Sequence, residues 1–260
     1  DSKFLSYGLV DNNNPILTPS ASMSFWNLLT VGVESIFDIT RYGHKAGYGN
    51  RAWRYQELDP GVSLTYAFSP DDISWLPTTI EVELGYMYEY HPRAMGGNAN
   101  GWGDTQFVWL EASMEDLWLE PYFYYERDID RDNGTYLYAE IGHTISLIDG
   151  EEEGDDPILS IRPMVGQGFG NAQRVRAYAC RYDAALDDYV PVDKAGLMDT
   201  CIKTELAWQV FEHFSLSGYV AYTAFVFDRQ IREGARCYEA TGDHERSWNF
   251  TAGVALTASF

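Results

Sequence analysis

Residues 247–260 read Ser-Trp-Asn-Phe-Thr-Ala-Gly-Val-Ala-Leu-Thr-Ala-Ser-Phe, and this stretch decides the fold class. Its large apolar side chains, from Trp248 to Phe260, all occupy even-numbered positions, whereas the odd-numbered positions carry small or polar side chains. A period of two belongs to a β-strand, whose successive side chains point to opposite faces of a sheet. The stretch therefore predicts a strand with one apolar face and one polar face.

The same alternation recurs along the chain. In the segment 78–90, for example, Val82 and Leu84 alternate with Glu81 and Glu83. Helical spacings of apolar residues are scarce by comparison, so the pattern predicts an all-β fold. The predicted strands cover residues 22–32, 60–69, 78–90, 104–114, 117–128, 134–147, 157–168, 199–211, 214–228 and 247–260.

Composition excludes several classes of protein. The 260 residues carry a formal net charge of −21, and 15% of them are aromatic. A chain this rich in aromatic side chains can bury a large apolar surface and is not a disordered acidic chain. Its acidity argues against nucleic-acid binding, which depends on Lys and Arg neutralising phosphates. No stretch approaches the roughly 18 continuous apolar residues of a membrane-spanning helix.

The lengths of the strands and of their connections favour a transmembrane barrel. Several predicted strands exceed the about five or six residues usual in a soluble sheet and match the roughly 9–11 residues that cross a bilayer at a tilt. Short periplasmic turns and long external loops are typical of outer-membrane barrels. The mostly long connections are 33–59, 91–103, 129–133, 169–198 and 229–246. The short ones, on the side of the termini, are 70–77, 115–116, 148–156 and 212–213.

The sequence thus predicts one domain over residues 1–260, since all-β barrels of this length are commonly single units. We expect a single antiparallel up-and-down transmembrane β-barrel of about ten strands, with eight or twelve as alternatives. Residues 1–20 are expected to form a periplasmic N-terminal segment.

The final strand, over 248–260, resembles that of the bacterial outer-membrane β-barrel superfamily, including its small porin-like members. The resemblance rests on alternating aromatic and aliphatic side chains that end in a C-terminal Phe260. In that superfamily such a strand is read by the barrel-insertion machinery, so the resemblance implies an insertion signal of Trp248, Phe250 and Phe260. It also implies a location in the bacterial outer membrane, in contact with outer-membrane lipid and lipopolysaccharide. The resemblance does not indicate a substrate.

The polar side chains, which occupy every second position of the strands, would line the lumen of such a barrel. Most of its charged side chains are acidic, and cations occur only on the later strands. The predicted lumen-lining residues are Glu81, Glu83, Glu89, Glu111, Glu120, Glu126, Glu140, Arg162, Lys203 and Glu205.

Two interpretations of this lumen stay open. An acidic wall around a narrow water-filled path would favour cations, as rings of Asp and Glu do in cation channels. Alternatively, Arg162 and Lys203 pair with neighbouring glutamates and, together with tyrosines, fill a barrel only slightly wider than an eight-stranded one. The sequence therefore predicts a passive porin-like pore without a cofactor. The alternative is a closed structural or partner-binding barrel.

Asp128, Asp130 and Asp132 resemble the start of an EF-hand calcium loop. The sequence then departs from that loop, because its glycine arrives one residue late and Ala139 stands where the twelfth position requires Glu. A tight hairpin with an Asn-Gly turn explains the same residues. We favour the hairpin and keep calcium as the alternative.

The three cysteines, Cys180, Cys201 and Cys237, fall in or beside the predicted external loops. Since a secreted protein is oxidised there, we expect one disulfide, either Cys180 to Cys201 or Cys201 to Cys237. Zinc is the weaker alternative, because no Cys-x-x-Cys spacing is present.

The remaining polar residues point to no catalytic site. The five histidines lack metal-ligand spacing and are predicted to be isolated surface or interface residues: His44, His91, His143, His213 and His244. No enzymatic activity is predicted, because the adjacent Asp243 and His244 match no catalytic motif. The long loops carry aromatic side chains such as Trp53 and Tyr178. These suit a surface protein partner or homo-oligomer, or else shielding of the barrel mouth.

Overall fold

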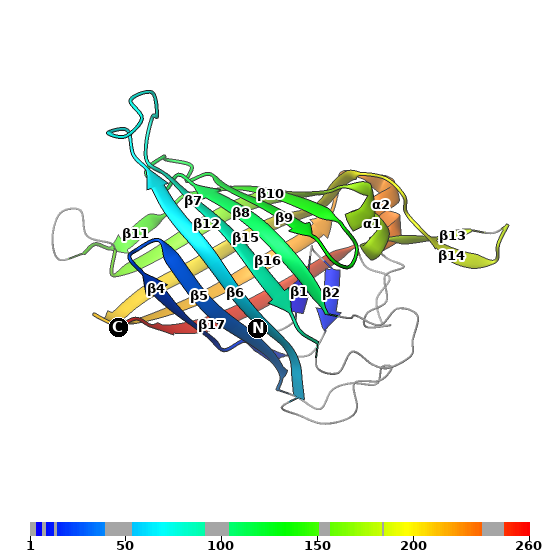
Figure 1. Ribbon diagram of the computed structural model, residues 1–260, viewed down its shortest axis with the longest axis horizontal. Coiled ribbons are helices and arrows are strands. Elements are labelled where there is room, and N and C mark those ends of the chain that lie inside the picture. Colours follow the sequence, from blue (N-terminus) through cyan, green and yellow to red (C-terminus); the bar gives the residue numbers. More distant parts are fainter. Residues whose placement is uncertain are drawn as a thin grey trace.

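The computed structural model describes residues 4–6, 9–12, 15–39, 54–91, 104–150, 157–183, 185–235 and 247–260 (Figure 1). The helices are α1 (Ala172–Tyr178) and α2 (Arg229–Ala235). Within these ranges no helix is long and apolar enough to cross a membrane. The strands are β1 (Phe4–Ser6), β2 (Leu9–Asn12), β3 (Ile16–Leu17), β4 (Ser20–Phe25), β5 (Leu29–Asp38), β6 (Arg54–Phe68), β7 (Ile80–Glu89), β8 (Thr105–Ser113), β9 (Tyr122–Asp128), β10 (Thr135–Gly142), β11 (Ile145–Ile148), β12 (Leu159–Gly170), β13 (Cys180–Asp183), β14 (Asp188–Pro191), β15 (Gly196–Phe211), β16 (Phe214–Phe225) and β17 (Trp248–Ala258).

Thirteen of these strands form one sheet. Its order is β17-β16-β15-β12-β10-β9-β8-β7-β6-β5-β3, while β4 also pairs with β5 and β11 with β12. Every ladder in it is antiparallel. The hairpins β1–β2 and β13–β14 form two small separate sheets. The prediction of an all-β antiparallel fold is therefore confirmed.

The C-terminal stretch forms β17 with the alternation that its sequence predicts. Phe250 pairs with Tyr222 of β16, and Leu256 pairs with Leu216, so apolar positions of the two strands face each other. Leu256 is 72% exposed, whereas Thr251, on the other parity, is buried. The two parities of β17 therefore lie in different environments.

The predicted strand 22–32 is wrong, because it runs through a turn. β4 and β5 form a hairpin, and its turn contains Trp26 and Asn27, whose φ angles are 57° and 52°. Phe25 pairs with Leu29 across this turn. The apolar residues of β4 and of β5 therefore both fall at odd-numbered positions, as they would in one continuous strand. The unbroken parity in the sequence concealed a change of chain direction.

The predicted connection 33–59 is also wrong in its extent. β5 continues to Asp38 and β6 already begins at Arg54. The charged residues at the start of β6 and Pro60 are typical of a loop, which is why sequence alone placed them outside the sheet. In the structure, Glu57 and Asp59 are buried on β6.

The structure also changes the predicted strands 117–128 and 134–147, by a later start in the first and a division of the second. β9 begins at Tyr122, because the residues before it form a hydrogen-bonded turn between Met114 and Pro121. The predicted strand 134–147 is divided into β10 and β11, which pair with successive parts of β12.

The sheet has two chemically different faces. On the exposed face, large apolar side chains stand at alternate positions of successive strands: Val31, Leu64, Leu84, Leu110, Phe123, Leu137, Val165, Ile202, Val220 and Phe250. The opposite parity, which we call the enclosed face, carries the buried residues Ser63, Phe107, Glu126, Tyr136, Met164, Ala221, Thr223 and Thr251. The sheet curves around this second face (Figure 1).

Glycines allow aromatic rings to lie flat on the enclosed face. Tyr138 of β10 covers Gly166 of β12, and Tyr136 covers Gly168, so closely that a Cβ atom at either glycine would overlap the ring. In the β10–β12 ladder Tyr138 pairs with Gly168 and Tyr136 with Gly170, so each ring reaches diagonally to the glycine two residues before its partner. The rings therefore lie along the enclosed face of β12.

The two helices pack over one end of the sheet, beside the ends of β12, β15 and β16 (Figure 1). α1 begins after Asn171, whose side chain accepts a hydrogen bond from the backbone N–H of Arg174, as an N-cap does. The helices enclose a cluster of buried side chains: Tyr136, Val175, Tyr178, Ala179, Val192, Met198, Phe225, Ile231 and Ala235. This cluster holds both helices against the end of the enclosed face.

Candidate functional site

The enclosed face carries nearly all the residues predicted to line a lumen. The register pairs Glu83 with Glu111, Glu126 with Tyr136, and Arg162 with Glu205, all on the enclosed parity. Glu81, Glu89, Glu140 and Lys203 share that parity. Glu120 alone lies outside a strand, in the turn between β8 and β9.

Arg162 bridges two acids near the end of β12. Its Nε lies 2.8 Å from Glu120 Oε2, and its Nη1 lies 3.5 Å from Glu140 Oε1. The Thr144 hydroxyl also donates to Glu120. Burial raises the pKa of Glu120, but the hydrogen bonds from Thr144 and the Arg162 guanidinium outweigh burial and hold its pKa below the usual value.

Arg174 of α1 is a functional candidate that sequence reasoning missed. It is fully buried, and its Nη2 lies 2.9 Å from Glu126 Oε1. Its guanidinium also lies 3.6 Å from Asp132 and 5.8 Å from the centroid of the Phe107 ring. The sequence placed it in the loop 169–198. The helix-capping Asn171 followed by helix-forming residues was the signal that could have revealed α1.

The other charged and tyrosine side chains of this region are also paired. Lys203 Nζ lies 3.0 Å from Glu205 and 5.1 Å from the centroid of the Tyr219 ring. The Tyr138 hydroxyl donates to Glu140, as the Tyr136 hydroxyl does to Asp199. Glu126, Glu140, Asp199 and Glu205 of the enclosed face therefore each have a cation or a tyrosine as a partner.

The face differs on β5 to β8, where acids gather and no arginine among the described side chains bridges them in this way. We call this group the acidic arc, and its members are Glu34, Glu57, Asp59, Glu83, Glu89 and Glu111. Glu57 and Asp59 are each only 7% exposed. Since a buried carboxylate without compensation is unfavourable by several kcal/mol, this arc must hold protons, water or cations.

One part of the acidic arc brings three metal-ligating side chains together. Ligand atoms of Glu57, Glu89 and His91 all lie within 4.8 Å of one another. His91 Nε2 is 3.3 Å from Glu57 Oε2. The prediction that His91 is isolated is therefore wrong, because residues distant in sequence meet across the β6–β7 ladder.

The aspartates of the calcium candidate do not form such a group. Asp128 accepts hydrogen bonds from the backbone N–H groups of Asp130 and Arg131, and from the Thr105 hydroxyl. Asp132 accepts from the backbone N–H of Gly134 and lies near Arg174. Asn133 has a φ of 53°, as a tight turn requires. These carboxylates order the hairpin between β9 and β10.

No disulfide joins Cys180 and Cys201 in the described part of the chain. Cys201 lies within β15 on the enclosed face, opposite Thr223 of β16, whereas Cys180 begins β13 beyond α1. The prediction that Cys201 sits at the edge of a loop is wrong, because β15 begins at Gly196. Cys237 lies outside the described residues, so a bond from Cys201 to Cys237 stays a prediction.

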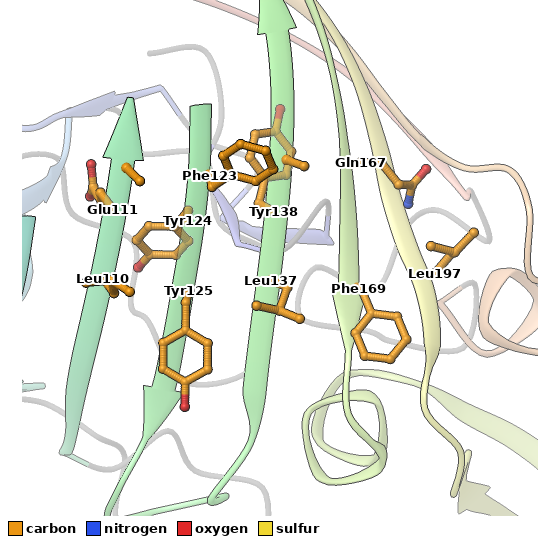
Figure 2. Close-up of a pocket in the computed structure, with 12 residues that line it drawn as sticks. Leu110, Glu111, Phe123, Tyr124, Tyr125, Leu137, Tyr138, Gln167, Phe169 and Leu197 are labelled. Carbon is orange, nitrogen blue, oxygen red and sulfur yellow. The ribbon is translucent and has the colours of Figure 1, made fainter. Parts of the chain in front are cut away.

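The exposed face carries an apolar groove of about 340 Å³ over β8, β9, β10, β12 and β15 (Figure 2). Leu110, Tyr125, Leu137, Phe169 and Leu197 contribute to it (Figure 2). All but Tyr125 are at least 36% exposed. The side chains named here make this part of the exposed face apolar.

The predicted insertion residues also lie on the exposed side. Trp248 stacks on Tyr222 of β16, with ring centroids 6.1 Å apart, and Phe260 is 99% exposed. Among other sequence candidates, His44, Trp53, Asp243 and His244 lie outside the described residues.

The chain matches no protein-family model and no curated protein.

Proposed function

We propose that this chain is a small porin-like β-barrel of the bacterial outer membrane, with a narrow passive path that favours cations. The observation that carries the proposal is the division of one curved sheet into an apolar exposed face and a polar, acid-rich enclosed face. In a transmembrane barrel, lipid-facing and lumen-facing residues alternate along every strand in this way.

The extent of the exposed apolar surface supports the membrane location. A soluble protein rarely exposes an apolar patch larger than a few hundred Å². Here apolar side chains stand at alternate positions across β5 to β17, from Val31 to Val254. The groove in Figure 2 continues this surface. We propose that outer-membrane lipid, including lipopolysaccharide on the external side, covers it.

Closure of the sheet is part of the proposal. The path from β17 to β3 contains eleven strands, whereas bacterial barrels have an even number. β2 contacts β17. We therefore propose that residues before β3 supply a twelfth strand, in place of the about ten expected from the sequence. In a closed barrel the β17 amides that do not bond to β16 exchange slowly with solvent, and fast exchange of these amides would contradict closure.

The acidic arc supports cation preference. Glu83 and Glu111 face each other across β7 and β8, and Glu57 and Asp59 lie farther along the same wall. The bridges made by Arg162 and Arg174 involve acids of β9, β10 and the turns beside them, and not the members of the acidic arc. A path along the arc would present a negative potential to entering ions, which favours cations.

A closed barrel that serves a structural or partner-binding role is the alternative, and one observation favours it. Arg174, α1 and the rings of Tyr136 and Tyr138 occupy one end of the enclosed face. Such a barrel would bind a surface protein or a second copy of the chain through its external loops. Both the open pore and the closed barrel would carry the same insertion signal and use the same barrel-insertion machinery.

Conductance across a planar lipid bilayer separates the two versions. Protein refolded in detergent is added to one side in a potassium chloride gradient. The proposal expects small steps of current that persist as the voltage is changed. It also expects a reversal potential displaced toward the equilibrium potential of potassium. Anion selectivity, or no current from protein whose folding is verified by circular dichroism, would contradict the pore and leave the closed barrel.

A further inference from the structure

Three acids of the acidic arc, near the start of β6 and at the end of β7, lie beside a histidine. The register of the ladder continues through the Leu58–Tyr90 bridge, so that Asp59 faces Glu89 and Glu57 faces His91. This puts three carboxyl groups and one imidazole at adjacent positions of two strands.

The backbone positions the imidazole. The His91 N–H donates to Asp104 Oδ1 at 2.9 Å, and the Tyr88 hydroxyl donates to Asp104 Oδ2 at 2.8 Å. Asp104 thus ties the end of β7 to the start of β8. His91 is held beside Glu57 by these contacts and by the β6–β7 ladder.

Asp59 gives an observation independent of the three clustered ligands. Asp59 is 7% exposed, and among the described residues its Oδ1 has no hydrogen-bond partner. It interacts with both Glu57 and Glu89. A buried carboxylate oxygen without a donor is unfavourable unless a proton, a water molecule or a cation binds it.

We propose that Glu57, Glu89 and His91 bind a divalent transition-metal ion, with Asp59 completing a four-coordinate shell. One imidazole nitrogen with carboxylate oxygens suits Zn²⁺. Calcium and magnesium prefer oxygen ligands alone, so the histidine selects against them. A divalent ion would also neutralise carboxylates that no arginine of the described part of the chain bridges, which gives the cluster a physical reason to exist.

The site does not depend on the pore. It rests on β6, β7 and His91, and both an open and a closed barrel would contain it. A failed conductance measurement would therefore leave this proposal intact, and absence of metal binding would leave the pore proposal intact.

Zinc titration of the folded, tag-free protein in detergent tests the site. The probe is Zn²⁺ in competition with a chromophoric chelator, and we expect one ion per chain. The substitutions Glu57→Gln and His91→Gln should each weaken Zn²⁺ binding at least tenfold. Changing a residue that only supports a ligand typically weakens binding about 10- to 100-fold, and removing the ligand itself should weaken it at least as much. The double variant Glu83→Gln/Glu111→Gln removes two acids of the same arc and should change the affinity by less than about twofold.

Two further measurements keep the test independent of folding defects. Bound Zn²⁺ should raise the melting temperature of the native chain but not that of Glu57→Gln, whose loss of a buried charge should itself favour folding. X-ray absorption at the zinc edge should show one imidazole and otherwise oxygen ligands. Unsaturable binding, unchanged affinity in both ligand variants, or equal competition by Ca²⁺ would overturn the proposal.

Discussion

Arg174 of α1 lies with its Nη2 2.9 Å from Glu126 Oε1 of β9, and this pair joins a helix outside the sheet to one end of the enclosed face. Arg174 is fully buried and Glu126 is 7% exposed. Two charges so far from water are tolerated only with good geometry and further hydrogen bonds. The Tyr124 hydroxyl supplies one such bond to Glu126. The helix is therefore fixed by an ion pair as well as by apolar packing.

Breaking this pair should be strongly destabilising. Arg174→Met keeps much of the side-chain volume but leaves Glu126 buried beside no guanidinium. We expect a loss of about 3–5 kcal/mol in the free energy of unfolding, the range for removing one partner of a buried pair. Urea unfolding in detergent, followed by tryptophan fluorescence, measures it.

The matched control is Arg176→Met on the same helix. Arg176 is exposed, so its removal should change stability by less than about 0.5 kcal/mol. Equal effects of the two substitutions would mean that the helix, and not the ion pair, accounts for the loss.

The close approach of Tyr138 to Gly166 predicts a second effect. A Cβ atom at Gly166 would overlap the tyrosine ring, so Gly166→Ala should force the ring or the strand to move. We expect a destabilisation of about 1–3 kcal/mol, as for other overpacked sites. Gly218→Ala is the control, because the nearest atom to its added Cβ is 3.6 Å away. The double variant Gly166→Ala/Tyr138→Leu should recover part of the loss, and no recovery would argue against the ring as the cause.

The sequence predicted the exposed face better than the enclosed one. Apolar alternation, as in Leu84 or Val254, depends only on residues two apart and is therefore visible in one strand. The turn at Trp26 was missed because three residues between β4 and β5 leave the parity unchanged. Parity gives the face of each residue but not the direction of the chain.

The contacts of the enclosed face depend on residues far apart in the sequence. Glu57 and His91 are 34 positions apart and meet only through the β6–β7 register. Arg174 reaches Glu126 from a helix that sequence placed in a loop. Many of the acidic residues share one face of the sheet, as their alternation predicts, but their partners could follow only from strand order and register.

Glu120 predicts a dependence of stability on pH. Its pKa in the folded chain is below the usual value of about 4.3, because Thr144 and Arg162 stabilise its charged form. The stabilisation is therefore present above the pKa of the unfolded chain and is lost as the pH falls through the lower folded pKa. The unfolding free energies of the native chain and of Glu120→Gln should differ most at neutral pH and converge toward pH 3.

The control for this prediction is Glu115→Gln, an exposed residue of the same turn. Its difference from the native chain should not vary with pH in this range. A difference for Glu120→Gln that stays constant from pH 7 to about pH 3 would show that the side chain acts by packing and not by its charge.

If the chain conducts, the acidic arc should set the selectivity. Glu83→Gln/Glu111→Gln removes two facing acids from the wall, so the permeability ratio of potassium to chloride should fall toward one. The effect should shrink in 1 M salt, where the Debye length is about 3 Å. Glu212→Gln, in the short turn between β15 and β16, should leave the ratio unchanged. Equal changes in both variants would argue against a path along the arc.

The C-terminal Phe260 should matter for assembly and little for stability. It is 99% exposed, and its ring makes an edge contact with Phe214 and a tilted contact with His213 at the end of the sheet. If it is part of an insertion signal, Phe260→Ala should lower the amount of protein in outer-membrane fractions several-fold, while the variant refolded in detergent unfolds within about 0.5 kcal/mol of the native chain. Phe211→Ala is the control, since Phe211 is also an exposed aromatic residue at the same end of the sheet. A signal specific to the terminus requires that Phe211→Ala reach the membrane normally. If both substitutions reduce assembly equally, loss of an interfacial aromatic residue explains the effect and Phe260 carries no special role.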